Sequence, residues 1–233
     1  MINEKETVKC EAVFNDDRTH RFLWKQVWNK DKPLACVVML NPCAADCIIY
    51  DTTTYLVVNN IASLETYGGV EIVNIYSKLT SKLNLRWDSD EELNDSDNDT
   101  YIKKAAAECD TVVLAWGTGA ITNKRVLERV KDVLAELKPF AKKLYVITDG
   151  DEMRAVHPLT PQVRNTWVLE PFKASDIEVP VKPRVTKPKS IETEEQADDN
   201  SSDAAIASDG DTEDSAESIT VEDDNENDTD SDS

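Results

Sequence analysis

The stretch Ala35-Cys36-Val37-Val38-Met39-Leu40, followed directly by Asn41-Pro42, decides the fold class of this chain. A short apolar run of this kind is typical of a central strand that is buried on both faces of a sheet. Three further runs resemble it, at Val70–Ile75, Thr111–Trp116 and Leu144–Thr148. Together the four runs predict the middle of a parallel sheet.

Helical patterns separate these runs along the chain. Residues 54–66 end at Gly68-Gly69, and residues 124–138 repeat their aliphatic side chains with a 3.6-residue period up to Pro139. Alternation of strands and helices predicts an α/β fold with three layers, in which helices cover both faces of a mainly parallel central sheet. Residues 10–15 and 20–28 are interpreted as a flanking hairpin, and Asp88–Asp99 as a polar loop.

The charge is distributed very unevenly. Of the net charge of −20, −18 belongs to residues 190–233, which contain 18 acidic residues and no Lys or Arg, and residues 173–189 carry +3, which leaves −5 for residues 1–172. Repelling charges and few apolar side chains predict a disordered acidic tail over 190–233. Residues 173–189, with three prolines, are interpreted as a linker, and residues 1–172 as the one folded domain.

Location and cofactors are inferred from what the sequence lacks. Residues 1–7 have no apolar signal segment, five is an odd number of cysteines, and no apolar run reaches 18 residues. We therefore expect a cytoplasmic protein with reduced thiols and no membrane contact. Asp95, Asp97 and Asp99 have the opening spacing of a calcium loop, but Thr100 and Ala106 break the pattern. No metal and no cofactor is expected.

Polar residues follow each of the four central runs. They are Asn41-Pro42, Asn74, Trp116-Gly117, and the segment from Asp149 to His157-Pro158. Open α/β sheets bind ligands at the carboxyl ends of their strands. Any one of these positions alone is typical of an ordinary turn, and the four together predict a binding site.

Two of these side chains have the chemistry of a base-handling site. Asn74 interrupts an apolar run, and its amide can both donate to and accept from the edge of a base. His157 precedes a proline that restricts its backbone, and a fixed imidazole can stabilise a developing anion. The structural alternatives are a satisfied core amide for Asn74 and a surface histidine for His157.

A succession of short motifs resembles the domain-of-unknown-function 1643 family over about residues 10–172. The motifs are His20-Arg21-Phe22-Leu23-Trp24, Val38-Met39-Leu40-Asn41-Pro42-Cys43-Ala44-Ala45-Asp46, Asp51-Thr52, Tyr67-Gly68-Gly69-Val70, Val73-Asn74-Ile75-Tyr76, Asp97-Asn98, Ala115-Trp116-Gly117 and His157-Pro158-Leu159. The chain departs from the family pattern at Cys43-Ala44, where Ser-Thr is common, and at Tyr50-Asp51-Thr52-Thr53, where Asp-Asp-Pro-Thr is usual. The resemblance implies a fold more than an activity.

A more distant resemblance is to the uracil-DNA glycosylase superfamily, through the order Asn41-Pro42, Asn74, Trp116-Gly117, His157-Pro158. Leu159-Thr160-Pro161 replaces the usual Ser-Pro ending. The resemblance implies a glycosylase-like fold in which Asn41 positions a water and His157 stabilises the departing base. Tyr50 or Tyr76 is the expected stacking partner for that base. The substrate-binding positions are Pro42, Asp46, Asp51, Asn74, Trp116 and Gly117.

These observations predict a glycosylase-like protein from an uncharacterised family, a hydrolase of an N-glycosidic bond in a nucleic acid or nucleotide. Whether it is an enzyme stays open at this point. One alternative is a non-catalytic, regulatory protein that binds a nucleobase or nucleotide. Another is that the acidic tail mimics nucleic acid and contacts a basic protein.

Overall fold

The computed structural model describes residues 2–3, 5–43, 45–150 and 153–178. The chain divides into two compact units, Met1–Pro183 and Arg184–Ser233, and every described residue belongs to the first. The acidic tail expected at 190–233, and residues 179–189 of the expected linker, therefore lie outside the described residues.

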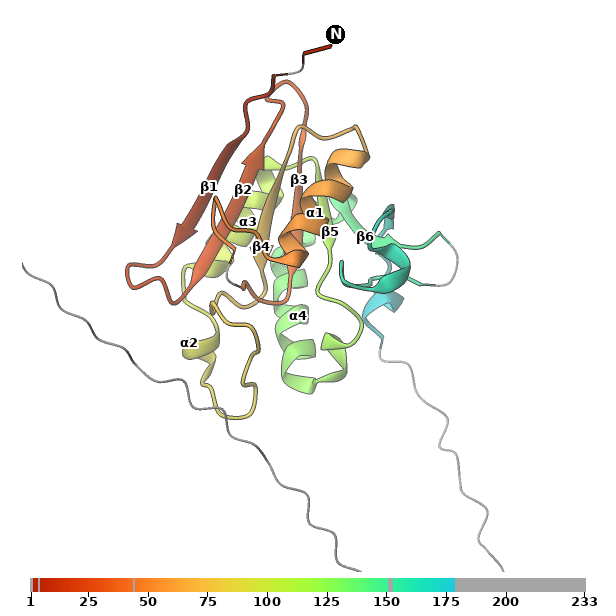
Figure 1. The fold of residues 1–233 in the computed structure, drawn as a ribbon. Coiled ribbons are helices and arrows are strands. Elements are labelled where there is room, and N and C mark those ends of the chain that lie inside the picture. The colour runs from red at the N-terminus through yellow and green to blue at the C-terminus, as the bar shows by residue number, and fades with distance from the viewer. Residues whose placement is uncertain (1, 4, 44, 151–152, 179–233) are drawn as a thin grey trace, which may run out of the picture. The chain divides into compact units, whose positions relative to one another are not determined.

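A seven-stranded sheet in the order β1-β2-β4-β3-β5-β6-β7 forms the centre of the described unit (Figure 1). The four central strands run parallel to one another, and each begins and ends within two residues of a predicted run. They are β3 (Leu34–Met39), β4 (Gly69–Asn74), β5 (Thr111–Leu114) and β6 (Leu144–Thr148).

The expectation of a mainly parallel sheet is wrong, because both edges of the sheet are antiparallel. β1 (Lys9–Phe14) and β2 (Arg21–Val27) form the expected hairpin and extend the sheet beside β4, and β7 (Val168–Pro171) returns beside β6. Parallel neighbours need a long crossover connection. The six residues between β1 and β2 can only turn the chain back, so the sheet is mixed.

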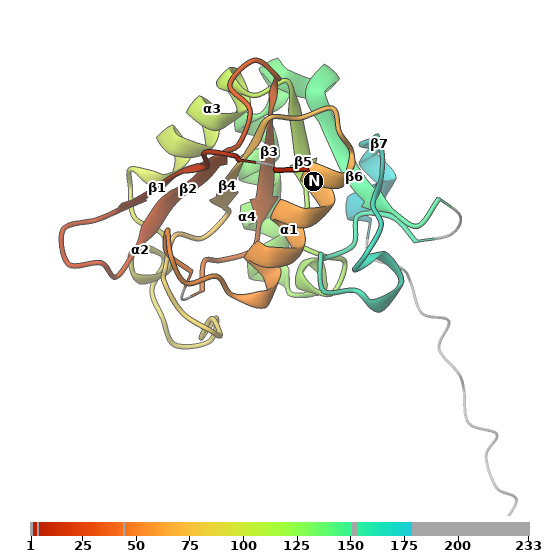
Figure 2. The ribbon, with the colours of Figure 1, turned by 45° about the horizontal axis from the view of Figure 1, so that its top comes forward.

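Helices cover both faces of the sheet (Figure 2). The α1-side cluster packs α1 (Thr52–Ser63) on one face, through Val57 and Ile61 against side chains such as Val37 and Ile72. The α3/α4-side cluster packs α3 (Asn98–Glu108) and α4 (Lys124–Glu136) on the other face, through Ile102 and Val130 against Val38 and Val73. The α/β layering expected from the sequence is confirmed at this level.

The segment Asp88–Asp99, interpreted from the sequence as a polar loop, contains helical structure. α2 (Asp90–Leu93) begins at a capping box in which the Ser89 hydroxyl accepts from Glu92 N and the Glu92 carboxylate accepts from Ser89 N. α3 begins at Asn98, inside the same segment. The 3-10 turns of the described chain are η1 (Ala120–Thr122), η2 (Lys138–Lys143), η3 (Pro161–Val163) and η4 (Ala174–Ile177).

The last described residues are attached to the sheet. Arg154 Nε lies 2.9 Å from Asp176 Oδ1 in η4, and a second ion pair joins Arg154 to Glu170 in β7. The first part of the expected linker, residues 173–178, thus contains a short helical turn that an ion pair attaches to Arg154.

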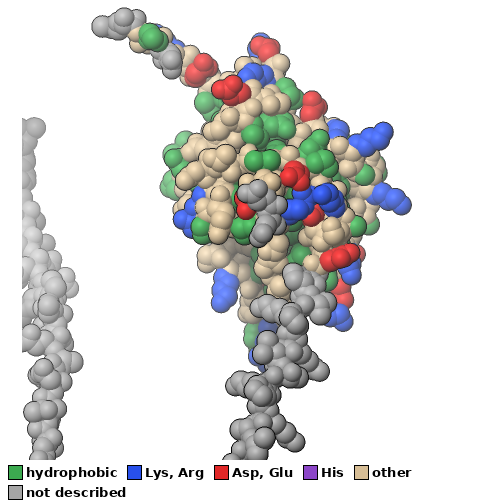
Figure 3. Space-filling view, turned by 90° about the vertical axis from the view of Figure 1, so that its right-hand side faces the viewer, with side chains coloured by type: hydrophobic (Ala, Val, Ile, Leu, Met, Phe, Trp, Pro, Cys, Tyr) green, Lys and Arg blue, Asp and Glu red, His purple; other side chains and the backbone are tan. Residues whose placement is uncertain are grey.

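The surface, the helices and the cysteines give three further observations. On the face seen in Figure 3, Lys and Arg side chains are intermixed with Asp and Glu side chains, without a continuous basic stripe. No helix in the described ranges is long and apolar enough to cross a membrane. All five cysteines are free.

Candidate active site

A cavity of about 100 Å³ lies at the carboxyl end of β3, on the face of the sheet that α1 covers. Its walls come from β2, the end of β3, the loop that follows β3, the first turn of α1, and the segment after β6. It is lined by Arg21, Met39, Leu40, Asn41, Cys43, Asp51, Thr53 and His157. The fold therefore brings Asn41 and His157, the two expected catalytic residues, to one cavity, together with Asp51.

The amide of Asn41 is held in one orientation. Its Nδ2 donates to the backbone oxygen of Thr80 at 2.7 Å and to that of Pro42 at 3.1 Å. Both donors are thereby engaged, which leaves Oδ1 as the acceptor that Asn41 offers to another molecule. Pro42 itself is buried, and its backbone oxygen also accepts from Thr80 N, so Pro42 contributes to the loop and not to the cavity lining.

His157 is held as a neutral imidazole. Leu159 N donates to its Nδ1 at 3.1 Å, so Nδ1 carries no proton and the ring proton resides on Nε2. Burial lowers the pKa of His157, and the negative charge of Asp51 opposes this shift. At neutral pH the ring is therefore an uncharged donor through Nε2.

Gly117 determines how closely the β5 end approaches His157. Its φ of +87° lies in the left-handed region that favours glycine, and a Cβ placed there would be 3.0 Å from the Cβ of His157. The turn after β5 thus forms the surface against which His157 packs. Gly117 acts through His157 and does not itself line the cavity.

Asp51 links the helix to the charged groups of the cavity. It is the N-cap of α1, where its Oδ1 accepts from Thr54 N at 2.7 Å. Its negative charge acts on both His157 and Arg21, raising the pKa of each against the opposing effect of burial.

Arg21 is the main site residue that the sequence did not identify. Its side chain is 1% exposed, and it lines the cavity from β2. The only signal for it was its place in the His20-Arg21-Phe22 motif, which indicates a family resemblance but not a direction for the side chain.

Of the six expected binding residues only Asp51 lines the cavity, and two of the others, Asn74 and Trp116, have their contacts elsewhere in the fold. Asn74 is paired in register with Met39 and does not line the cavity. Its Nδ2 is buried without a hydrogen-bond partner among the described residues, and its backbone oxygen accepts a hydrogen bond from Asn98 Nδ2. Trp116 belongs to the α3/α4-side cluster, on the opposite face of the sheet from the cavity. The fold thus assembles two members of the expected trio Asn41, Asn74 and His157.

Asp46 and Tyr50 stabilise the loop before α1. The Asp46 carboxylate accepts from the backbone N–H groups of Ile48 and Ile49, and these hydrogen bonds lower its pKa. Tyr50 packs edge-on against Trp24, whose indole donates to the Asp46 backbone oxygen. These contacts give both residues a structural function in the described loop.

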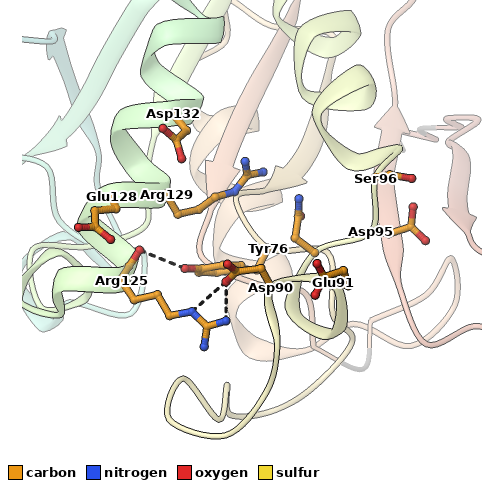
Figure 4. Close-up of a pocket in the computed structure, with 10 residues that line it drawn as sticks. Tyr76, Asp90, Glu91, Asp95, Ser96, Arg125, Glu128, Arg129 and Asp132 are labelled. Atoms are coloured by element: carbon orange, nitrogen blue, oxygen red, sulfur yellow. Dashed lines mark hydrogen bonds and ion pairs between the residues drawn. The ribbon is translucent and has the colours of Figure 1, made fainter.

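A larger hollow of about 640 Å³ lies on the other face of the sheet (Figure 4). We call it the acidic groove, since it is lined by Tyr76, Asp90, Glu91, Asn94, Asp95, Ser96, Arg125, Glu128, Arg129 and Asp132. Arg125 pairs with Asp90 at 2.5 Å, and Arg129 pairs with Asp99. Both cations are already neutralised by these partners, and four further carboxylates remain in the lining, so the groove repels a phosphate.

Comparisons with known proteins support the family resemblance. A family model described as "Protein of unknown function (DUF1643)" matches residues 21–159, which is more than half of the chain. Neither the curated proteins nor the solved structures contain a match. The matched segment includes Arg21, Asn41, Asp51 and His157, so it contains the polar residues that surround the cavity. The chain belongs to the DUF1643 family.

Proposed function

We propose that this protein hydrolyses an N-glycosidic bond in a nucleotide or nucleic acid, at the cavity that Asn41 and His157 share. The observation that carries the proposal is the meeting of these two side chains, distant in sequence, beside the carboxylate of Asp51. The distant resemblance to uracil-DNA glycosylases motivates the choice of reaction, since it assigns those roles to the same two positions.

The attacking water is assigned to Asn41. The amide is anchored through Nδ2, so its Oδ1 can accept a hydrogen bond from a water and orient the oxygen lone pair toward the sugar. An amide cannot take up the proton, so the water adds to a sugar that has already gained oxocarbenium character, and the proton that the water loses passes to the departing anionic base. The carboxylate of Asp51 in the same cavity stabilises that positive charge.

The departing base is assigned to His157. Cleavage leaves negative charge on the base, and the Nε2–H group of the neutral imidazole can donate a hydrogen bond to that charge. Preorganised donors of this kind contribute about 100- to 1,000-fold in rate. Asn74 receives no part in the reaction, because its side chain does not line the cavity.

The test is release of free base, measured by chromatography, from nucleosides, nucleoside monophosphates, single-stranded DNA and RNA, and duplex DNA. His157→Ala and Asn41→Ala should each lower the rate at least about tenfold. The matched control is Asn94→Ala, which removes an asparagine from the acidic groove. If Asn94→Ala abolishes release while Asn41→Ala is fully active, the reaction site is the groove and the proposal is wrong.

A binding protein is the second candidate. The amide of Asn41 favours it, because a hydrolase with no general base at this position can reach only a modest rate of hydrolysis. In that case a ligand raises the thermal stability of the protein while base release is absent from every substrate. The two assays together therefore separate catalysis from recognition.

A further inference from the structure

Arg21 reaches the cavity because of an irregularity in β2. Val13 pairs with Leu23 and Phe14 pairs with Arg21, so Phe22 is an extra residue at a β-bulge. Regular alternation would give Arg21 the same face as Leu23, which packs against the α3/α4-side cluster. The bulge instead lets Phe22 stack on Tyr101 of α3 while Arg21 turns to the α1 face.

The guanidinium of Arg21 is buried with a donor left over. Nη1 donates to the backbone oxygen of Ala45 at 2.9 Å, whereas Nε is buried without a hydrogen-bond partner in the described structure. Burial lowers the pKa of Arg21 to about 10, so the group is still charged at neutral pH. A buried charge without a close counter-charge is costly.

Other arginines of the described chain show what Arg21 lacks. Arg125, Arg129 and Arg154 each have a carboxylate oxygen within ion-pair distance. No such ion pair is present for Arg21 among the described residues, although Asp51 is close enough to affect its pKa. The arrangement is that of a cation whose partner is supplied from outside the chain.

A second positive feature faces the same cavity. α1 is 12 residues long, and its N-terminal end carries the positive pole of the helix dipole. Thr53, at the second position of the helix, lines the cavity and offers a hydroxyl group as well. Helix N-termini are common binding sites for phosphate. The opposing charge in the described lining is Asp51, which can accept a hydrogen bond from a sugar hydroxyl.

The burial of the lining residues grades from floor to rim. Arg21 and Met39 are 1% and 4% exposed, whereas Asn41, Asp51, Thr53 and His157 are only half-buried. The cavity of about 100 Å³ is far smaller than the roughly 300–1,000 Å³ of sites that enclose a drug-sized ligand. It has room for one small group at the floor, with the rest of the ligand at the rim.

We propose that this cavity binds a terminal phosphate between Arg21 at its floor and the first turn of α1 at its rim, and that the substrate is a nucleoside monophosphate. This inference rests on the proposed function and names its substrate class. The sugar then lies at the rim with Asn41 and His157. A buried floor accepts a phosphate monoester, whereas the phosphodiester of a continuing strand has to leave on both sides.

The test measures binding to the full chain by calorimetry and by thermal unfolding, with inorganic phosphate, uridine monophosphate, uridine and uracil as probes. Uridine monophosphate should bind at least about tenfold more tightly than uridine, which is the loss expected for a charged hydrogen bond. At 100 times its Kd the nucleotide should raise Tm by about 5 to 10 °C. Inorganic phosphate should compete with it.

Two variants complete the test. Arg21→Gln should abolish the preference for the phosphorylated ligand, and Arg125→Gln, which removes an arginine of the acidic groove, should keep it. Circular dichroism checks the fold of both. If Arg21→Gln does not fold, Arg21→Lys, which keeps the charge but not the fork, should reduce the preference. Equal binding of uridine and uridine monophosphate by the wild-type chain overturns the inference.

The inference and the proposed function fail in different ways. Phosphate-dependent binding without release of base refutes the hydrolysis and leaves the phosphate site standing. Equal release of base from nucleosides and nucleotides refutes the phosphate site and leaves the hydrolysis standing.

Discussion

Replacing Gly117 by alanine tests whether the turn after β5 positions His157. The substitution has two costs. Alanine at a left-handed φ of +87° loses about 1 kcal/mol net, once the lower entropy of the unfolded chain is included. The new Cβ would also lie 3.0 Å from the Cβ of His157, and overpacking of this kind costs about 1–3 kcal/mol. We expect a total loss of about 2–4 kcal/mol.

Gly150→Ala is the matched control for the backbone cost. Gly150 has a φ of +91°, and a Cβ placed there would have Val168 Cγ2 as its nearest atom at 3.9 Å, which is an ordinary contact. This control should lose only about 1 kcal/mol. The difference between the two variants, measured by urea unfolding, isolates the contact with His157.

The imidazole supplies an independent measurement. The chain has only two histidines, so the ring signals of His157 can be followed by NMR through a pH titration. Burial lowers the pKa of His157, and Gly117→Ala should return it toward the ordinary value by moving the ring outward. If the imidazole ring moves by about 0.3 Å, the rate of base release should also fall about fourfold, because a displacement of 1 Å lowers a rate by about 100-fold. Equal stability of the two variants with an unchanged His157 pKa would refute the reasoning.

Three further predictions concern charge. Burial lowers the pKa of both His20 and His157, so the folded state binds fewer protons than the unfolded chain at acidic pH. The free energy of unfolding should therefore be intact above about pH 6.5 and decline as the pH falls below it. The decline should be smaller in His157→Gln, as urea unfolding at several pH values will measure. Lys25→Met should lower the free energy of unfolding by about 3 kcal/mol, because the Glu71 side chain, which is 2% exposed and has its Oε1 2.6 Å from Lys25 Nζ, would keep a buried charge without its partner. Adding Glu71→Gln should recover most of that loss. A Lys25→Met variant as stable as the wild type contradicts this prediction. Asp51→Ala should lower the free energy of unfolding by about 1 kcal/mol, because α1 loses its N-cap. Asp51→Asn should keep the cap but lower the pKa of His157 further, since the charge of Asp51 raises that pKa in the wild type. An unchanged NMR titration of His157 in Asp51→Asn argues against this coupling.

The central strands could be predicted because each is buried on both faces and therefore apolar throughout. β3 and β6 begin and end within one residue of the predicted runs. β7 could not be found in this way, because Val168–Pro171 is a four-residue edge strand with two exposed ends. The antiparallel edge beside β6 was therefore missed, and the expected hairpin was taken to flank the sheet instead of extending it, so the mixed character of the sheet was not predicted.

α3 was missed because its buried face has little apolar signal. That face consists of Asn98, Ile102, Ala105 and Ala106. Two alanines and one isoleucine do not stand out in a hydrophobic pattern, and the burial of Asn98 depends on its hydrogen bond to the backbone oxygen of Asn74. A contact between distant segments of this kind has no local signature.

The site was partly readable from strand ends. Asn41 and His157 follow central strands, and the rule that ligands bind at carboxyl ends is enough to bring them together. Alternation along β5 would have separated Trp116 from them, since it continues the face of Leu114, which packs against α3 and α4. Arg21 could not be placed, because a bulge changes the alternation and leaves no mark in the residue types.

The extra residue in β2 lets adjacent positions of one strand serve opposite layers of the molecule. Deleting Phe22 would withdraw an aromatic ring from Tyr101 and restore regular pairing, while Arg21 would stay opposite Phe14 and on the α1 face. The packing of α3 can therefore be altered at this point of the chain without moving the charge beneath α1. Any engineered change in the length of this hairpin has to be made at its tip, before Arg21, if both layers are to stay in register.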